Sequence, residues 1–402
     1  MVYFNIVLSI LLFQFSPACA NNAKSKSSDT GDAIVQTATK EVIYPVLFEY
    51  EKKYPLKEIV LQDIAEVSYT SFSDKDVLFE QGTGDLSVSG RFKIICNPKE
   101  GTVFVFDENN TLTHKFNRSG GGPDEYQSIN HICVDLEAGE IFIFDYPLKY
   151  KVLVYSFDGK LKRKFSLKQP LWVESVLDYD EKHMVVCFNV HKSEKKTVMD
   201  KWERRYYLLS KADGGMAPIV VNIKYPISNK VLTKGPGGRG HMFGIPSKTI
   251  IRNGKDVVIS DYGSDTVYVK NDKGLHPFLV KSPSVKDSDE PELVYAYLRT
   301  DDYTFLRKVI RRRENNGMKN FVVDNRTGGI FELKLINRDF PSADFVLESF
   351  DMNLPRNTVY SLLPANTYIE RNGNNLLSGE LKAFVSTLSE DSNDFLIEVK
   401  FK

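Results

Sequence analysis

Short apolar runs separated by polar turn residues fill most of the chain after residue 56. A typical run ends at a polar break, and the next run leads into Asp-Gly, Asn-Asn or Asp-Lys-Gly. Asn, Asp and Gly tolerate the positive φ that tight hairpin turns need, so the pattern predicts antiparallel strands joined by hairpins. A short helix fits the pattern instead at two places, Val46–Tyr54 and Pro291–Leu298.

One unit of this pattern repeats along the chain. Residues 91–96 and 103–106 match residues 140–145 and 152–155 at a single offset of 49 positions, with no gap. A third copy begins at Val257, 116 positions after Ile141. A sheet of three or four short strands cannot bury its apolar faces alone, and a recurrence every 40 to 50 residues is typical of propeller blades.

The repeat predicts six blades. Five units are centred near residues 95, 145, 187, 260 and 320, and a sixth combines residues 344–350, 358–363 and 395–401. Residues 58–72 have no unit of their own, and pairing them with the last blade would remove an exposed sheet edge. The expected fold is therefore all-β, a six-bladed propeller over residues 56–402 whose N-terminal strand closes the last blade. Five or seven blades are the alternatives.

The N-terminal segment differs from the rest. Residues 2–15 are almost wholly apolar and are followed by Ser16-Pro17-Ala18-Cys19-Ala20. A short apolar stretch that ends in small residues predicts a signal peptide over residues 1–20 rather than a membrane span. Cleavage before Cys19 would leave a lipidated cysteine and attach the protein to a membrane, whereas cleavage after Ala20 would release it. Residues 21–55 are expected to form a linker or tether.

The amino-acid composition limits the kinds of ligand that the protein is expected to bind. Lys and Arg number 53, as do Asp and Glu, so the net charge is zero and argues against nucleic acid as a partner. No His/Cys spacing of a metal site occurs, and the sequence leaves open whether a metal binds; no cofactor is expected. The three cysteines of the body lie in apolar runs and are interpreted as buried thiols. A monomer that binds a small molecule, a glycan or a protein fits these limits.

Three segments resemble a known family. Gly120–Tyr126 matches a G-x-G-P-x-E-Y loop, Ile59–Glu66 matches an I-x-L-x-D-I-A-E strand, and Phe395–Val399 matches a short apolar final strand. The chain is similar in these features to the NHL-like six-bladed β-propeller proteins of Bacteroidetes, which are often lipoproteins. The resemblance covers roughly residues 56–402. It implies a propeller in the periplasm or on the outer membrane or cell surface, and it implies no particular function.

Candidate ligand-binding residues come first from the glycine-rich loop. Its backbone N–H groups could hold an anion, with Arg118 beside them. The alternative is a connection between blades in which Gly makes the turn and Tyr126 packs between sheets. A packing role does not require the carboxylate of Glu125.

Further candidates lie at strand ends. Asp145 and Asp261 occupy equivalent positions, each followed by Tyr, and could bind a cation or sugar hydroxyls at the channel mouth. The alternative is a turn held by the Asp side chain. Arg239 and His241 belong to a second glycine-rich loop, Gly235–Gly240 with the residues after it, which lacks the strand and helix of a dinucleotide site. They would face either the channel or the surface.

Two functions remain open. The first is an exported, non-enzymatic binding or scaffold propeller whose ligand meets the central channel and the blade-end loops. The alternative is a propeller enzyme, a lyase or metal-assisted hydrolase, with His131, Asp145, Asp261 and His241 facing the channel. Three of these four side chains around one point would favour the enzyme.

Overall fold

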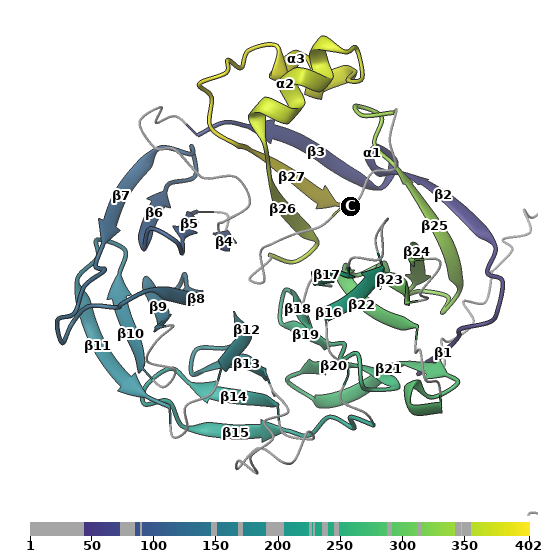
Figure 1. Cartoon of the computed structure of the whole chain (residues 1–402), viewed down its shortest axis with the longest axis horizontal. Coiled ribbons are helices and arrows are strands. Elements are labelled where there is room, and N and C mark those ends of the chain that lie inside the picture. The colour runs from purple at the N-terminus through teal and green to yellow at the C-terminus, as the bar shows by residue number, and fades with distance from the viewer. Residues whose placement is uncertain are drawn as a thin grey trace, which may run out of the picture. The chain divides into compact units, whose positions relative to one another are not determined.

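The computed structural model describes residues 44–72, 85–88, 91–145, 151–167, 172–189, 205–224, 227, 230–234, 240–244, 249–287, 292–311, 316–341, 347 and 355–402. All of them belong to one compact unit, residues 41–402. Their strands form six larger sheets around a common centre, which makes the protein a six-bladed β-propeller (Figure 1). The expected fold is thereby confirmed, including the blade count. No helix within the described ranges is long and apolar enough to cross a membrane.

The first three blades are four-stranded antiparallel sheets in which sequence order is spatial order. Blade one holds β4 (Asp85–Val88), β5 (Lys93–Asn97), β6 (Thr102–Phe106) and β7 (Leu112–Asn117). Blade two holds β8 (Ile129–Asp135), β9 (Glu140–Asp145), β10 (Lys151–Ser156) and β11 (Leu161–Ser166). Blade three holds β12 (Trp172–Asp178), β13 (His183–Asn189), β14 (Tyr206–Ser210) and β15 (Met216–Ile219).

Blades four and five each gain a fifth, parallel strand from the N-terminal segment. Blade four holds β18 (Ile250–Asn253), β19 (Asp256–Ile259), β20 (Thr266–Asn271), β21 (Gly274–Ser282) and β1 (Val46–Glu49). Blade five holds β22 (Leu293–Arg299), β23 (Tyr303–Arg311), β24 (Asn316–Asp324), β25 (Ile330–Ile336) and β2 (Leu56–Val60). The 3-10 helix η1 (Val285–Asp287) links these two blades.

Blade six joins the two ends of the described chain. Its strands are β26 (Thr358–Leu363), β27 (Phe395–Phe401) and β3 (Ala65–Thr70), in that spatial order. The pairing of β3 with β27 confirms the expected closure by an N-terminal strand. A short helix, α1 (Leu61–Ile64), precedes β3, and helices α2 (Ala365–Gly373) and α3 (Gly379–Val385) lie between β26 and β27. A separate hairpin, β16 (Lys230–Lys234) and β17 (Gly240–Gly244), follows blade three.

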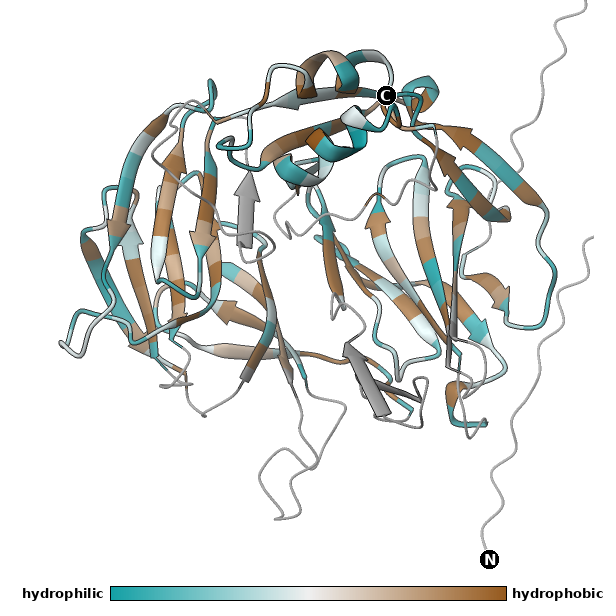
Figure 2. Cartoon of the chain, turned by 45° about the horizontal axis from the view of Figure 1, so that its top comes forward, coloured by the Kyte–Doolittle hydropathy of each residue, from teal (hydrophilic) through white to brown (hydrophobic). Residues whose placement is uncertain are grey.

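Apolar side chains on the blade faces pack against the next blade, and apolar residues are concentrated on the strands (Figure 2). The repeat found in the sequence marks one such contact. Gly159, in the turn of blade two, has a φ of +74°, and an added Cβ would lie 2.6 Å from Phe116 of blade one. Gly214 of blade three stands in the same relation to Phe165. The turn glycines therefore serve the packing between blades as well as the hairpins.

Two expectations from the sequence are wrong. Val46–Tyr54 and Pro291–Leu298 were candidate helices, but strand β1 occupies the start of the first segment and strand β22 occupies residues 293–298 of the second. Both segments bury apolar side chains between blades, and pairing with neighbouring strands overrides a weak local preference. Strand β1 also lies within the expected linker 21–55, so the described sheets begin before residue 56. The expected signal peptide, Cys19 and Arg239 lie outside the described residues.

The ring has two different faces. Because strands alternate in direction, connections between first and second and between third and fourth strands share one side, here called the turn face. Connections between second and third strands and between blades share the other, here called the insertion face. It carries the hairpin β16–β17 and the helices α2 and α3. Asn357, just before β26, bonds to Asn253 and Asp301 on the turn face, so the helical connection leaves β26 at the opposite end.

Candidate functional site

A β-bulge interrupts the innermost strand of blade three near the insertion face. The register of β12 shifts between Val173 and Ser175, so Glu174 is the extra residue. The innermost strand of blade two bulges in the same half, at Asn130, whose Nδ2 donates to the carbonyl of Val173 at 3.2 Å. Bulges re-aim side chains and occur often beside binding and active sites. They make the insertion-face ends of the innermost strands of blades two and three the candidate site.

Glu174 belongs to a buried charge cluster between blades three and four. Arg205, just before β14, forms a short ion pair with Glu174 and a second pair with Asp261 at 3.2 Å. The exposed fractions of these side chains are 8% for Glu174, 14% for Arg205 and 3% for Asp261. The hydroxyl of Tyr206 donates to Asp261 at 2.6 Å. One guanidinium thus holds two carboxylates from different blades.

Burial dominates the electrostatics of the cluster. It raises the pKa of Glu174, although the neighbouring Arg205 and His131 oppose that rise and Asp261 adds to it. Burial also raises the pKa of Cys187 to about 12, which keeps this thiol protonated and unreactive. Lys281, whose Nζ donates to the carbonyl of Asp261 at 3.3 Å, has its pKa lowered by burial to about 8. The site is therefore a desolvated set of acids and bases.

Two buried donors beside the cluster have no hydrogen-bond partner among the described residues. They are Nε of Arg205 and the hydroxyl of Ser175, which follows Glu174 directly. A buried polar group without a partner costs free energy, and such groups are rare in folded proteins. They give this end of blade three hydrogen-bonding capacity that the described chain does not use.

The glycine-rich loop has a different role. The carboxylate of Glu125 accepts a hydrogen bond from the backbone N–H of Gly122 at 2.8 Å and lies against Gly120, so it fills the loop that an anion was considered to occupy. The buried hydroxyl of Tyr126 donates to the carbonyl of Gly101 at 2.6 Å and accepts from the N–H of Arg118 at 2.9 Å. Burial raises the pKa of Tyr126 to about 12. These are contacts of a blade-to-blade connection.

The remaining candidates are dispersed. Asp145 accepts hydrogen bonds from the backbone N–H groups of Gln127 and Ser128, which holds the start of blade two. Of the predicted residues, Asp261 belongs to the Glu174 cluster, and His131 has a small electrostatic effect that lowers the pKa of Glu174. His241 lies in β17, and its side chain is not described. Within the described part of the chain, no three His, Cys, Asp or Glu side chains form a group that could hold a metal ion.

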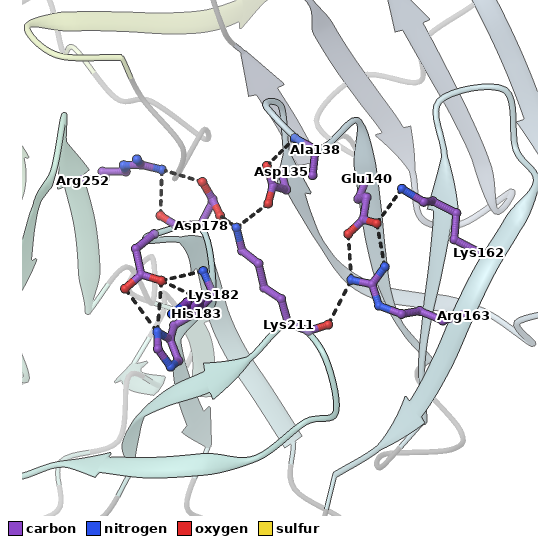
Figure 3. Close-up of polar contacts among 11 residues, drawn as sticks. Asp135, Ala138, Glu140, Lys162, Arg163, Asp178, Lys182, His183, Lys211 and Arg252 are labelled. Carbon is purple, nitrogen blue, oxygen red and sulfur yellow. Dashed lines mark hydrogen bonds and ion pairs between the residues drawn. The ribbon is translucent and has the colours of Figure 1, made fainter.

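A second charge network, which the sequence analysis missed, lies on the turn face (Figure 3). Lys211 of blade three pairs with Asp135 of blade two at 2.5 Å and with Asp178 at 2.6 Å. Arg252 of blade four reaches Asp178 at 3.2 Å. Three successive blades are linked in this way. A sequence signal existed, because the innermost strands of several blades end in, or just before, an acid or amide: Asp135, Asp178, Asn253 and Asp301.

Comparison with known proteins supports the six-bladed fold. A family model described as a 6-bladed beta-propeller, DUF5128, matches residues 46–313. A crystal structure of a candidate exported protein from Bacteroides fragilis is similar, with a TM-score of 0.63 and 15% identity over 89% of this chain and 99% of that chain. At this identity the likeness shows a common fold alone.

More distant structures add no functional argument. A member of the duf4221 family from Bacteroides vulgatus has a TM-score of 0.44 at 10% identity, over 84% of this chain and 98% of that one. Virginiamycin B lyase from Staphylococcus aureus has a TM-score of 0.38 at 12% identity, over 84% of this chain and 100% of the lyase. Among curated proteins none matches the chain.

Proposed function

The chain belongs to the DUF5128 family of six-bladed β-propellers, and on that premise we propose that it is an exported, non-enzymatic binding propeller whose ligand meets the insertion face beside Glu174. Export rests on the apolar segment of residues 2–15 and the small residues after it. The protein then resides in the periplasm or at the cell surface, attached to a membrane through Cys19 when cleavage precedes that residue.

One observation carries the proposal: the bulged, partly unsatisfied Glu174–Arg205–Asp261 cluster lies on the face that holds the insertions. In repeat proteins, insertions into single repeats gather on one face, which is often the binding face. Rigid scaffolds likewise place binding residues on their longer loops. The turn face instead has short turns and ion pairs that are satisfied between blades.

The chemistry of the cluster favours a polar, uncharged ligand such as a glycan or a peptide. Glu174 presents carboxylate oxygens that only accept hydrogen bonds, while Nε of Arg205 only donates. Sugar hydroxyls and peptide amides combine both capacities and fit such a pair. Arg205 already pairs with both carboxylates of the cluster, so a charged ligand would have to compete with these ion pairs.

The test is a ligand screen with two matched variants. Glu174→Gln and Asp178→Asn each neutralise a buried acid in strand β12, the first near the insertion face and the second at the turn face. Purified wild-type protein and both variants are screened against glycan and peptide libraries by thermal shift, and ligands that bind are titrated. We expect binding to weaken at least about tenfold in Glu174→Gln, equivalent to about 1.4 kcal/mol, and to persist in Asp178→Asn. Ligands that bind both variants equally, or that are lost only in Asp178→Asn, would contradict the proposal.

A further inference from the structure

Residues 44–52 lie across the seam between two blades. Strand β1 pairs in parallel with the outer strand of blade four, from Val46 opposite Leu279 to Glu49 opposite Ser282. The N–H of Tyr50 continues this ladder by donating to the carbonyl of Ser282 at 2.9 Å. The segment thus covers an edge that the blade would otherwise expose.

The side chains of the same segment contact blade five. The ring of Phe48 is fully buried and meets Phe321 edge-on, with 5.2 Å between ring centroids. The hydroxyl of Tyr44 donates to the carbonyl of Asn325 at 2.7 Å. The carbonyl of Tyr50 accepts a hydrogen bond from the buried Lys308 at 2.8 Å. Backbone pairing with one blade and anchoring in the next make the segment a clamp between them.

The link from this segment to the rest of the chain is exposed. Glu51, Lys52 and Lys53 are all exposed, and β2 then adds to the outer strand of blade five as an independent parallel pairing. Recognition by strand addition has this form, in which main-chain hydrogen bonds supply affinity and a pocket for an alternate side chain supplies specificity. Phe48 is the side chain buried against blade five, whereas its neighbour Leu47 points outward and is 51% exposed.

We propose that the seam between blades four and five is a binding site for an extended apolar segment, occupied in this chain by its own residues 44–52. The segment is a ligand held within the molecule, with Phe48 as its anchor. This site is separate from the insertion face, so it stands or fails independently of the proposed function.

The experiment uses the full chain with a specific protease site inserted between Lys52 and Lys53. After folding and cleavage, we expect the fragment ending at Lys52 to remain bound during gel filtration and to be replaced by excess labelled peptide of residues 44–52. A peptide with Phe48→Ala should compete at least about tenfold more weakly, while one with Leu47→Ala should compete as the wild-type peptide does. Loss of the fragment on cleavage with an unchanged Tm, or equal competition by the two peptides, would overturn the proposal.

Two variants of the uncleaved chain test the proposal even if the cleaved protein precipitates. In the intact chain, Phe48→Ala should lower Tm clearly, and Leu47→Ala should leave it unchanged. Equal melting of both variants would refute an anchoring role for Phe48, whatever the cleaved protein does.

Discussion

Several buried charges among the described residues are matched by an opposite charge from a neighbouring blade. Lys211 is the clearest case, because its side chain is only 5% exposed and its ammonium group lies between Asp135 and Asp178. Two carboxylates at such a position would repel one another without the cation. Glu174 and Asp261 are related to Arg205 in the same way at the other end of the ring.

Lys211→Met should destabilise the protein by about 3–5 kcal/mol, because it leaves two buried carboxylates without their counter-ion. The matched control is Lys160→Met, which removes an exposed lysine from its pair with Asp158 and should leave stability unchanged. Urea unfolding followed by tryptophan fluorescence measures both. Equal stabilities for the two variants would show that the turn-face network does not hold the blades together.

At the scale of elements, Glu140 ties the outer strand of blade two to its second strand through ion pairs with Lys162 and Arg163. Arg163 of β11 forms two hydrogen bonds with Glu140 of β9, at 2.6 and 2.7 Å, and a third with the carbonyl of Lys211 in blade three. The hydrogen bonds from Arg163, together with the one from Lys162, lower the pKa of Glu140 from 4.5 to about 2, against the opposing effect of burial. The stability that Glu140 gives to this blade therefore depends on pH.

The contributions of Glu140 and Glu174 to stability depend on pH in opposite directions. The stabilisation from Glu140 is complete above pH 4.5 and is lost as the pH falls towards about 2, so the stability gap between wild type and Glu140→Gln should shrink over that interval. Glu174, whose pKa is raised, should behave oppositely, since its ionisation opposes folding as the pH rises above 4.5. Denaturant titrations across these intervals measure both gaps. A Glu140→Gln gap that is constant with pH would refute the ion pair.

The sequence predicted the strands better than it predicted which distant residues contact one another. Alternating apolar runs and turn residues were sufficient for the antiparallel strands of blades one to five, which follow one another in the sequence. The same rules failed for β22, because a strand buried on both faces lacks the alternation that distinguishes it from a helix. They failed for β1 because its outward-facing residue, Leu47, is also apolar. The cluster of Glu174 and Asp261 was only half predicted. Its members lie 87 positions apart, and only the stacking of blades three and four brings them together.

At the scale of the molecule, the N-terminal segment covers three successive blades. Strands β1, β2 and β3 add to blades four, five and six in turn, and the last of them pairs with the C-terminal strand β27 (Figure 1). The ring is thus closed by the two ends of the described chain, and the edges of three blades are covered. Glu174 lies on the insertion face of this closed ring, and the Lys211 network lies on the turn face.

The ligand is proposed to bind the insertion face and not the turn face. Hydrogen exchange with and without the tightest ligand from the glycan and peptide screen tests this proposal most directly. The backbone amides of residues 172–176, 205–208 and 129–131 should exchange more slowly when the ligand is bound, because they surround Glu174. The turns at residues 136–139 and 211–215 on the opposite face should exchange at unchanged rates. Protection confined to those turns, with none around Glu174, would contradict the account.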